Sequence, residues 1–260
     1  MAETIAVLSQ KGGTGKTTTV RTLADVFRRV GLDVLAVDLD PQGNLSDYFD
    51  VPADASPTVA DVLAGQARAA DAIHDGSILP ANLGLAEAEL ILAGKMGREM
   101  TLKRGLRDVK RRYDLVVIDC PPSLGLLTVN ALVAADHALI SSEAEYFSLQ
   151  GVEQALEVVE LAKESLHPQL DWLGVVLNIA DLRLIHAREA LQQLRSRFGE
   201  KVFDTVIKRS VRYAESAERG VSILDYAPDL GSDYLALAGE ILGRLGFAEE
   251  RSRVAEMVAA

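Results

Sequence analysis

The chain has 260 residues, with 27 Lys and Arg against 38 Asp and Glu and a formal net charge of −11. Hydrophobic residues make up 48% of the sequence and charged residues 25%, which excludes a disordered, collagen-like or mucin-like chain. This length suits one α/β domain. We therefore expect a single domain over residues 1–247 and a C-terminal tail, residues 248–260, that frays.

The single cysteine and the start of the chain indicate the cellular compartment. Cys120 cannot form an internal disulfide, and one cysteine cannot supply the ligands of an iron–sulfur site. The first residues lack the basic start and long apolar run of a signal peptide, and no apolar run approaches the ~20 residues of a membrane-spanning helix. We therefore expect a cytoplasmic protein. The acidic average argues against coating of nucleic acid over the whole surface, but it is compatible with a local basic patch.

Short β-branched apolar runs alternate with longer amphipathic stretches, the pattern of βα units around a parallel sheet. In chain order, the predicted strands are Thr4–Ser9, Asp33–Asp38, Ile78–Leu85, Leu115–Asp119, His137–Ser141, Trp172–Asn178 and Val202–Ile207. The predicted helices are Thr17–Val30, Leu102–Arg112, Leu149–Ser165, Arg188–Phe198 and Tyr234–Leu245. The expected fold is α/β, with a doubly wound, mostly parallel sheet and helices on both of its faces.

A glycine-rich segment, residues 10–18 (Gln-Lys-Gly-Gly-Thr-Gly-Lys-Thr-Thr), joins the first predicted strand to the first predicted helix. Such a turn aims backbone N–H groups and the positive end of a helix dipole at one point, which is a phosphate site. Lys16 stands where a lysine reaches the β- and γ-phosphates, and the Thr17 hydroxyl stands at a Mg²⁺ position. The alternative is a strand–helix turn with a surface lysine, and the flanking elements argue against it.

Three aspartates lie at the carboxyl ends of predicted strands. Asp38 and Asp40 share one side of the second strand, at the edge where open α/β sheets bind ligands. Two carboxylates beside a triphosphate repel it unless one acts through Mg²⁺ and the other handles a water. Asp119 ends a buried apolar strand, like the carboxylate that holds Mg²⁺ in phosphate-loop NTPases. For residues 40–44, ordinary turn formation is the alternative.

These motifs resemble those of the deviant Walker A ATPases of the ParA/MinD/Soj group, whose loop reads Lys-Gly-Gly-x-Gly-Lys-Thr-Thr. Gln10 stands where the general phosphate loop has its first glycine, and Lys11 precedes the glycine pair instead. The resemblance covers residues 3–245, and its further matching segments are 121–125, 128–132, 145–151 and 207–216. It implies a P-loop NTPase fold of the deviant Walker A type.

The resemblance also implies an activity, a slow and partner-stimulated hydrolysis of ATP with Mg²⁺ in an ATP-bound homodimer. In this family the extra lysine reaches the partner's nucleotide, so Lys11 joins Lys16 as a catalytic residue and Asp40 orients or deprotonates the attacking water. Thr17 is the implied Mg²⁺ ligand, and Asp38 and Asp119 reach the ion through water. The implied nucleotide-binding residues are Lys11, Gly12, Gly13, Thr14, Gly15, Lys16, Thr17, Thr18, Asp38, Asp119, Pro121 and Asn178. A strand-terminal turn is the alternative for Asn178.

Residues 181–219 are locally basic, with nine Lys and Arg against six Asp and Glu. Arg183 and Arg212 align with arginines that contact the DNA backbone non-specifically in ParA-type relatives. A dimer would double this patch, and DNA affinity would then depend on nucleotide and on salt. Solvated arginines on helix faces are the alternative. We interpret a second basic run, Lys103–Arg112, mainly as a solvated helix face, and contact with DNA is the alternative.

The resemblance implies that the protein associates with the nucleoid and partitions a chromosome or plasmid, or positions another cargo, with a ParB-like activator. Three departures qualify the match. Lys208 stands where relatives usually have proline. The segment before the first strand lacks the Lys or Arg that relatives often use with such a partner, and we expect no winged-helix extension.

Three other functions share this fold. A MinD-like membrane-cycling ATPase needs a basic amphipathic C-terminal helix, whereas residues 247–257 hold two Arg against three Glu. We therefore expect no stable membrane association. A small-molecule ligase or amidotransferase can have a similar loop, but Lys11 and residues 38–44 favour the dimeric ATPase. The single cysteine disfavours an iron–sulfur carrier.

Overall fold

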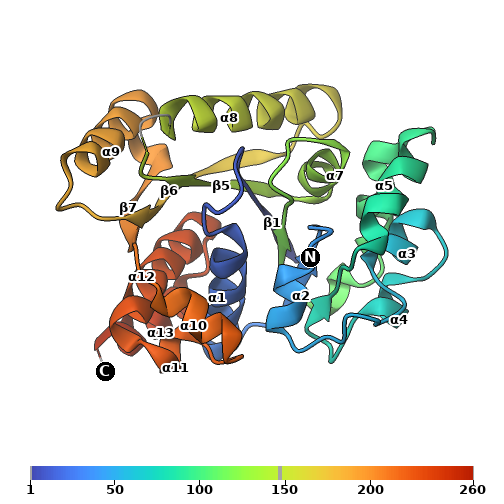
Figure 1. Cartoon of the computed structure of the whole chain (residues 1–260), viewed down its shortest axis with the longest axis horizontal. Helices are drawn as coiled ribbons and strands as arrows, with labels where there is room; N and C mark the ends of the chain where they lie inside the picture. Colours follow the sequence, from blue (N-terminus) through green and yellow to red (C-terminus); the bar gives the residue numbers. More distant parts are fainter. Residues whose placement is uncertain (1, 146–147, 260) are drawn as a thin grey trace.

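A seven-stranded parallel sheet forms the centre of the computed structural model, which describes residues 2–145 and 148–259 (Figure 1). Tyr146 and Phe147, in one of the family-like segments, lie outside the described residues. The strand order is β3-β2-β4-β1-β5-β6-β7. The strands are β1 (Glu3–Leu8), β2 (Val34–Asp38), β3 (Ile78–Leu79), β4 (Leu115–Asp119), β5 (His137–Glu143), β6 (Asp171–Ala180) and β7 (Val202–Lys208).

Helices cover both faces of the sheet, with α7, α8 and α9 on one side and α1 and α12 on the other (Figure 1). The helices are α1 (Lys16–Arg29), α2 (Asn44–Tyr48), α3 (Val59–Ala64), α4 (Ala69–Ala72), α5 (Gly84–Ala93), α6 (Thr101–Leu106), α7 (Leu126–Ala134), α8 (Ser148–Ser165), α9 (Ile185–Phe198), α10 (Arg212–Glu218), α11 (Ile223–Tyr226), α12 (Pro228–Leu245) and α13 (Ala248–Ala259). This arrangement confirms the predicted doubly wound α/β fold.

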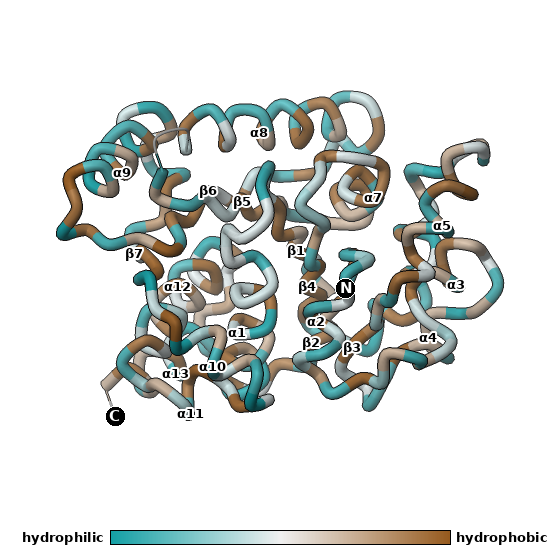
Figure 2. Tube along the Cα trace, in the orientation of Figure 1, coloured by the Kyte–Doolittle hydropathy of each residue, from teal (hydrophilic) through white to brown (hydrophobic). Residues whose placement is uncertain are grey.

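The sheet is apolar on both sides, so each face carries its own hydrophobic core. In β1, Ile5 and Val7 join the core beneath α1 and α12, whereas Ala6 and Leu8 join the core beneath α7 and α8. The outer helix α8 alternates between hydrophilic and hydrophobic residues along its length (Figure 2). Because β1 lies between β4 and β5 in the middle of the sheet, the loop that follows it occupies the centre of the carboxyl edge.

Several elements differ from the sequence prediction, which did not include the helices α2, α3, α4, α5, α10 and α11. The predicted strand Ile78–Leu85 pairs only over Ile78–Leu79, because Pro80 has no N–H for a sheet hydrogen bond. The predicted helix Leu102–Arg112 is divided into α6 and a separate 3-10 turn, Lys110–Arg112. Helix α7 was not predicted from periodicity, because seven of its nine residues are buried and no polar face marks it.

The prediction that residues 248–260 fray is wrong for the described part of the tail, which forms helix α13. Val254 is only 2% exposed, and its Cγ1 lies 3.7 Å from the point that a Cβ on Gly239 of α12 would occupy. Arg253 Nη1 donates to the carbonyl of Val30 at 2.7 Å. Within the described residues, no helix has the length and apolar character needed to cross a membrane.

Docking of α13 predicts a difference between two valines of the same helix. Val254→Ala should lower the free energy of unfolding by about 1–2 kcal/mol, because it removes two buried methyl groups. Val258 is 53% exposed, so Val258→Ala should change stability by less than about 0.5 kcal/mol. Urea denaturation of both variants measures this difference. Equal values for the two would contradict the docked tail.

Candidate nucleotide site

A cavity of about 730 Å³ lies at the carboxyl edge of the sheet. This volume is in the range of small-molecule sites. Its walls come from the loop after β1, the segment after β2, the end of β6 and helix α10. The residues of the predicted site that line it are Gly12, Gly13, Gly15, Lys16, Thr17, Thr18, Asp40 and Asn178.

The glycine-rich loop has the backbone geometry of a phosphate cradle. Gly13 and Gly15 have φ values of 78° and 76°, a region that side chains disfavour. A Cβ at Gly15 would also lie 2.8 Å from Asn178 Nδ2. Gly15 caps α1 without a side-chain hydrogen bond, and the first turn of α1 has no acidic residue. The N–H groups at this helix end are therefore available to an anion.

Lys16 is held inside the loop. Its side chain is 6% exposed, and Nζ donates to Ser9 Oγ at 2.8 Å and to the carbonyl of Lys11 at 3.2 Å. Burial lowers the pKa of Lys16, and the charge of Asp119 opposes this shift. The ammonium is thus positioned beside the cavity with little rotamer freedom left to lose on binding a phosphate.

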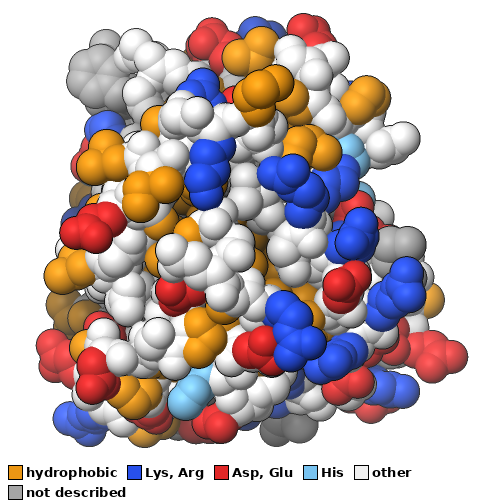
Figure 3. Space-filling model, turned by 90° about the vertical axis from the view of Figure 1, so that its right-hand side faces the viewer, with side chains coloured by type: hydrophobic (Ala, Val, Ile, Leu, Met, Phe, Trp, Pro, Cys, Tyr) orange, Lys and Arg blue, Asp and Glu red, His pale blue; other side chains and the backbone are white. Residues whose placement is uncertain are grey.

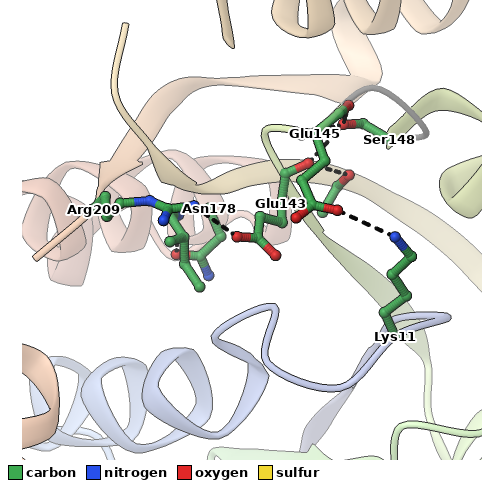
Figure 4. A network of polar contacts seen from close by, with 8 residues as sticks. Lys11, Glu143, Glu145, Ser148, Asn178 and Arg209 are labelled. Carbon is green, nitrogen blue, oxygen red and sulfur yellow. Dashed lines mark hydrogen bonds and ion pairs between the residues drawn. The ribbon is translucent and has the colours of Figure 1, made fainter. Parts of the chain in front are cut away.

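Lys11 points away from this cavity and lines a smaller neighbouring hollow. Its Nζ lies 3.2 Å from Glu145 Oε2 in the same chain, and the two side chains are 54% and 50% exposed (Figure 4). The two lysines of the loop therefore have different surroundings. Lys16 faces its own cavity, and Lys11 faces the surface.

Thr17 and Asp119 are in direct contact beside the loop. Thr17 Oγ1 donates to Asp119 Oδ2 at 2.7 Å, whereas Asp119 Oδ1 is buried and has no hydrogen-bond partner among the described residues. Burial raises the pKa of Asp119 well above its usual range, and the nearby charge of Asp38 adds to this shift. An unpartnered buried carboxylate oxygen next to a threonine hydroxyl is a position where a bound cation would be stabilised.

Asp38 and Asp40 have different environments. Asp38 is fully buried and accepts hydrogen bonds from the N–H groups of Asp40 at 3.0 Å and Ser46 at 2.9 Å, and from Ser46 Oγ at 2.8 Å. Burial raises the pKa of Asp38 to about 6, against these hydrogen bonds. Asp40 lines the cavity, and its Oδ1 accepts the N–H of Gln42 at 3.0 Å. Of this pair, Asp40 is the carboxylate presented to a ligand.

The residues present fit Mg²⁺ held together with phosphates. No three His, Cys, Asp or Glu side chains within the described ranges form a metal-binding group of their own. Mg²⁺ usually takes one or two protein carboxylates and completes its shell with phosphate oxygens and water. Thr17 and Asp119 would supply the protein's share of such a shell.

Two predicted contact residues, Thr14 and Pro121, are buried and do not line the cavity, and a third, Asn178, lines it. Thr14 is buried, with Oγ1 donating to Ser9 Oγ at 3.0 Å. Pro121 is buried, and Pro122 lines the cavity in its place. Asn178 Nδ2 donates to Thr19 Oγ1 at 3.0 Å and to Ser141 Oγ at 3.2 Å. The amide of Asn178 therefore joins helix α1 to strand β5 next to the loop, and its contact with adenine stays a prediction.

Sequence reasoning missed several polar and aromatic residues of the site. Ser9 accepts a hydrogen bond from the Lys16 ammonium, and Ser46 donates one to Asp38, although neither serine belongs to a recognisable motif.

Tyr213 lines the cavity. Its hydroxyl is buried and has no hydrogen-bond partner among the described residues, and its ring packs edge to face against Tyr234 with the ring centroids 5.9 Å apart. Ile179, also in the lining, has φ 52°, which is rare for a β-branched residue. Such backbone strain is typical of functional sites.

The arginines predicted to contact DNA are paired within the chain. Arg183 makes two hydrogen bonds to Asp181, at 2.8 and 2.7 Å, and Arg212 Nη1 lies 3.1 Å from Asp229 Oδ1. Both pairs are largely exposed, so they are screened by solvent.

Lys208, which stands where relatives usually have proline, pairs with Asp233 at 2.8 Å and does not line the cavity.

The second basic run contributes to a groove. Figure 3 shows the side of the molecule that carries α3, α4 and α5, where Lys and Arg side chains gather among exposed apolar ones. A groove of about 510 Å³ between α3, α4 and α6 is lined by Arg68, Lys95, Arg104 and Arg112 above apolar side chains. The interpretation of Lys103–Arg112 as a solvated face did not predict this concave surface.

The raised pKa of Asp38 predicts a pH dependence of stability. Because the folded pKa of about 6 exceeds the ordinary 3.8, protonated Asp38 favours the folded state, and this stabilisation is lost as the pH rises through 6. In metal-free buffer, the stability of the wild type minus that of Asp38→Asn should fall by about 1–3 kcal/mol between pH 4 and 6.5. Urea denaturation across this range measures the difference. A flat or rising difference would contradict the assignment.

Three comparisons place the chain among known proteins. A family model described as an AAA domain matches residues 2–172. The chromosome-partitioning ATPase Soj from Thermus thermophilus is 41% identical over 246 residues, which cover 93% of this chain and 96% of that protein. The structure of cobyrinic acid a,c-diamide synthase from Mycobacterium smegmatis, with bound ADP and magnesium, is 36% identical with a TM-score of 0.76, over 84% of this chain and 93% of that one.

A further solved structure, apo McdA from Cyanothece, has a TM-score of 0.85 at 26% identity, over 93% of this chain and all of that one. The family match covers more than half of the chain, and the Soj relative aligns over almost its whole length. The two-lysine loop and the strand-end aspartates lie within residues 2–172, which the family model matches. The chain therefore belongs to this AAA-domain family and, within it, to the Soj/ParA-type ATPases of the ParA/MinD superfamily.

Proposed function

We propose that the protein is an ATPase that dimerises on binding ATP, binds DNA non-specifically in that state, and partitions a chromosome or plasmid or positions another cargo. The observation that carries this proposal is the placement of two lysines on one phosphate loop. Lys16 is buried beside its own cavity, whereas Lys11 faces the surface. A lysine so placed is suited to a phosphate on a second chain.

In the proposed reaction, the loop N–H groups and Lys16 bind and orient the triphosphate. Mg²⁺, when bound, neutralises phosphate charge and aligns the phosphates. Asp40 borders the cavity and would orient the attacking water. Lys11 of a second chain would add positive charge at the transferred phosphate. Phosphoryl transfer depends mainly on positioning and charge neutralisation, so hydrolysis would be slow until this lysine is in place.

The same arrangement would couple nucleotide state to assembly. With ATP bound, the γ-phosphate of one chain would contact Lys11 of the other and stabilise the dimer. After hydrolysis, ADP lacks this phosphate and the chains would separate. The contacts of the γ-phosphate would thus shift the equilibrium between monomer and dimer. The Soj relative is named a chromosome-partitioning ATPase. We propose a ParB-like activator that stimulates hydrolysis, and association with the nucleoid through DNA.

A MinD-like membrane cycle is less compatible with this chain. Val254, the buried apolar residue of α13, packs against α12 and is not presented to a membrane surface. The helix also has Glu249 and Glu250 in its first turn, which anionic lipids repel. We therefore propose no stable membrane association.

A second candidate function is amide formation on a small molecule, which the 36% identical diamide synthase structure favours. The single thiol, Cys120, is fully buried, and burial raises its pKa far above the usual range. It is therefore not an activated nucleophile that could release ammonia from glutamine. ATP hydrolysis that required ammonia and a carboxylic acid would support this candidate, whereas hydrolysis stimulated by DNA and a partner protein would exclude it.

Removal of the water-orienting carboxylate should separate dimerisation from hydrolysis. We expect Asp40→Ala to bind ATP and form a lasting dimer, with hydrolysis reduced at least about 100-fold. Light scattering during size exclusion and phosphate release measure the two properties. Lys16→Ala is the control, because it should lose nucleotide binding and the dimer together. Normal turnover by Asp40→Ala would refute its role.

Charge reversal at the two aligned arginines should weaken DNA retention. With ATP and Mg²⁺, Arg183→Glu combined with Arg212→Glu should reduce affinity for duplex DNA at least about tenfold and flatten its salt dependence. The assay compares ATP, ADP and no nucleotide at two salt concentrations. Arg195→Glu with Arg197→Glu makes the same change in net charge within the same basic segment. Unchanged DNA retention in the first variant, or an equal loss in both, would refute the assignment.

A further inference from the structure

The Lys11–Glu145 ion pair joins the phosphate loop to the segment after β5. Lys11 Nζ lies 3.2 Å from Glu145 Oε2, and Figure 4 shows the lysine extended from the loop toward this carboxylate. The two residues are 134 positions apart in the chain. They meet because β1 and β5 are neighbours in the sheet and both end at its carboxyl edge.

The segment that carries Glu145 is held by further polar contacts. Ser148 Oγ donates to the carbonyl of Glu143 at 2.7 Å and accepts the N–H of Glu145 at 2.9 Å. Arg209 Nη2 donates to Glu143 Oε1 at 2.9 Å, which anchors the segment to the end of β7 (Figure 4). The hydrogen bonds of Ser148 thus hold the backbone next to Glu145 in place. Among the described residues, the ion-pair partner of the Glu145 side chain is Lys11.

Lys11 carries one positive charge, and Glu145 holds it against the surface of its own chain. A triphosphate bound to a second chain would attract the same charge. We propose that Glu145 is a positioning residue that holds Lys11 within its own chain and competes with the partner's triphosphate for it. This inference rests on the proposed ATP-bound dimer. It adds a latch, the Lys11–Glu145 pair, that opens once in each chain as the dimer forms.

The exposure of the pair determines how strong such a latch is. Both side chains are about half exposed, and exposed ion pairs make small, salt-screened contributions to stability. Two latches open per dimer, so their loss should strengthen dimerisation between about twofold and thirtyfold. A latch of this strength raises the protein concentration at which the ATP-bound dimer forms, but it does not prevent dimerisation.

The test is the dissociation constant of the dimer with a non-hydrolysable ATP analogue and Mg²⁺, measured by sedimentation equilibrium. Glu145→Gln keeps the size of the side chain and removes its charge, so we expect a dissociation constant about twofold to thirtyfold lower than that of the wild type. In a Lys11→Ala background, Glu145→Gln should produce no such gain. A purely structural role for Glu145 would not make its effect depend on Lys11.

Asp171→Asn is the matched control. This substitution removes the charge that pairs with Lys201, and the two side chains are 55% and 43% exposed, much like those of Glu145 and Lys11. The Lys201–Asp171 pair lies at the amino ends of the strands, opposite the nucleotide site. Asp171→Asn should therefore leave the dissociation constant of the dimer unchanged. An unchanged or higher dissociation constant for Glu145→Gln, in protein that unfolds at the wild-type temperature, would overturn the latch while the dimer stands. A wild type that stays monomeric with the analogue would overturn the proposed function, and the latch with it.

Discussion

Two buried carboxylates beside a phosphate loop are the constraint that organises this structure. Asp38 and Asp119 are direct neighbours in the register of β2 and β4, and burial raises the pKa of both. Like charges this close inside a protein are costly unless hydrogen bonds or a cation offset them. Ser46 and the N–H of Asp40 donate to Asp38, whereas the side chain of Asp119 has, among the described residues, Thr17 as its hydrogen-bond donor and Lys16 as a nearby positive charge. The site therefore favours a ligand that brings a cation to Asp119.

The order of strands explains how distant parts of the chain build this site. β1 lies at the centre, so its loop meets the segments that follow β4 and β5 on either side. Asn178, from the end of β6, lies close to Gly15 of the loop and donates to Thr19 of α1. A parallel sheet brings the carboxyl ends of all these strands to one edge. Strands β4, β5 and β6 and the segments that follow them thus supply the buried carboxylate beside Thr17, the partner of Lys11 and the contact with Gly15, all more than 100 residues from the loop in the sequence.

The sequence predicted the parts of this fold and site that local patterns encode. The alternation of apolar strands and amphipathic helices predicted the sheet, and the loop and strand-end aspartates predicted where a phosphate site would form. Contacts between distant segments, such as Lys11 with Glu145 or Lys16 with Ser9, leave no periodic trace and could not be predicted. The docked tail was missed for the same reason, because the space that receives Val254 exists only once α12 has folded.

The two lysines of the loop differ in a way that suits Lys16 to nucleotide binding and Lys11 to association of two chains. Lys16 is buried and hydrogen-bonded, so its position is set before any ligand arrives, and its contacts with a phosphate need little further ordering. Lys11 is half exposed and paired through a weak surface contact, so moving it costs little free energy. A rigid lysine suits tight binding of a nucleotide within one chain. A lysine that changes partners easily suits an interface that must form and dissolve in every cycle, and a loop with both can make assembly depend on the nucleotide it holds.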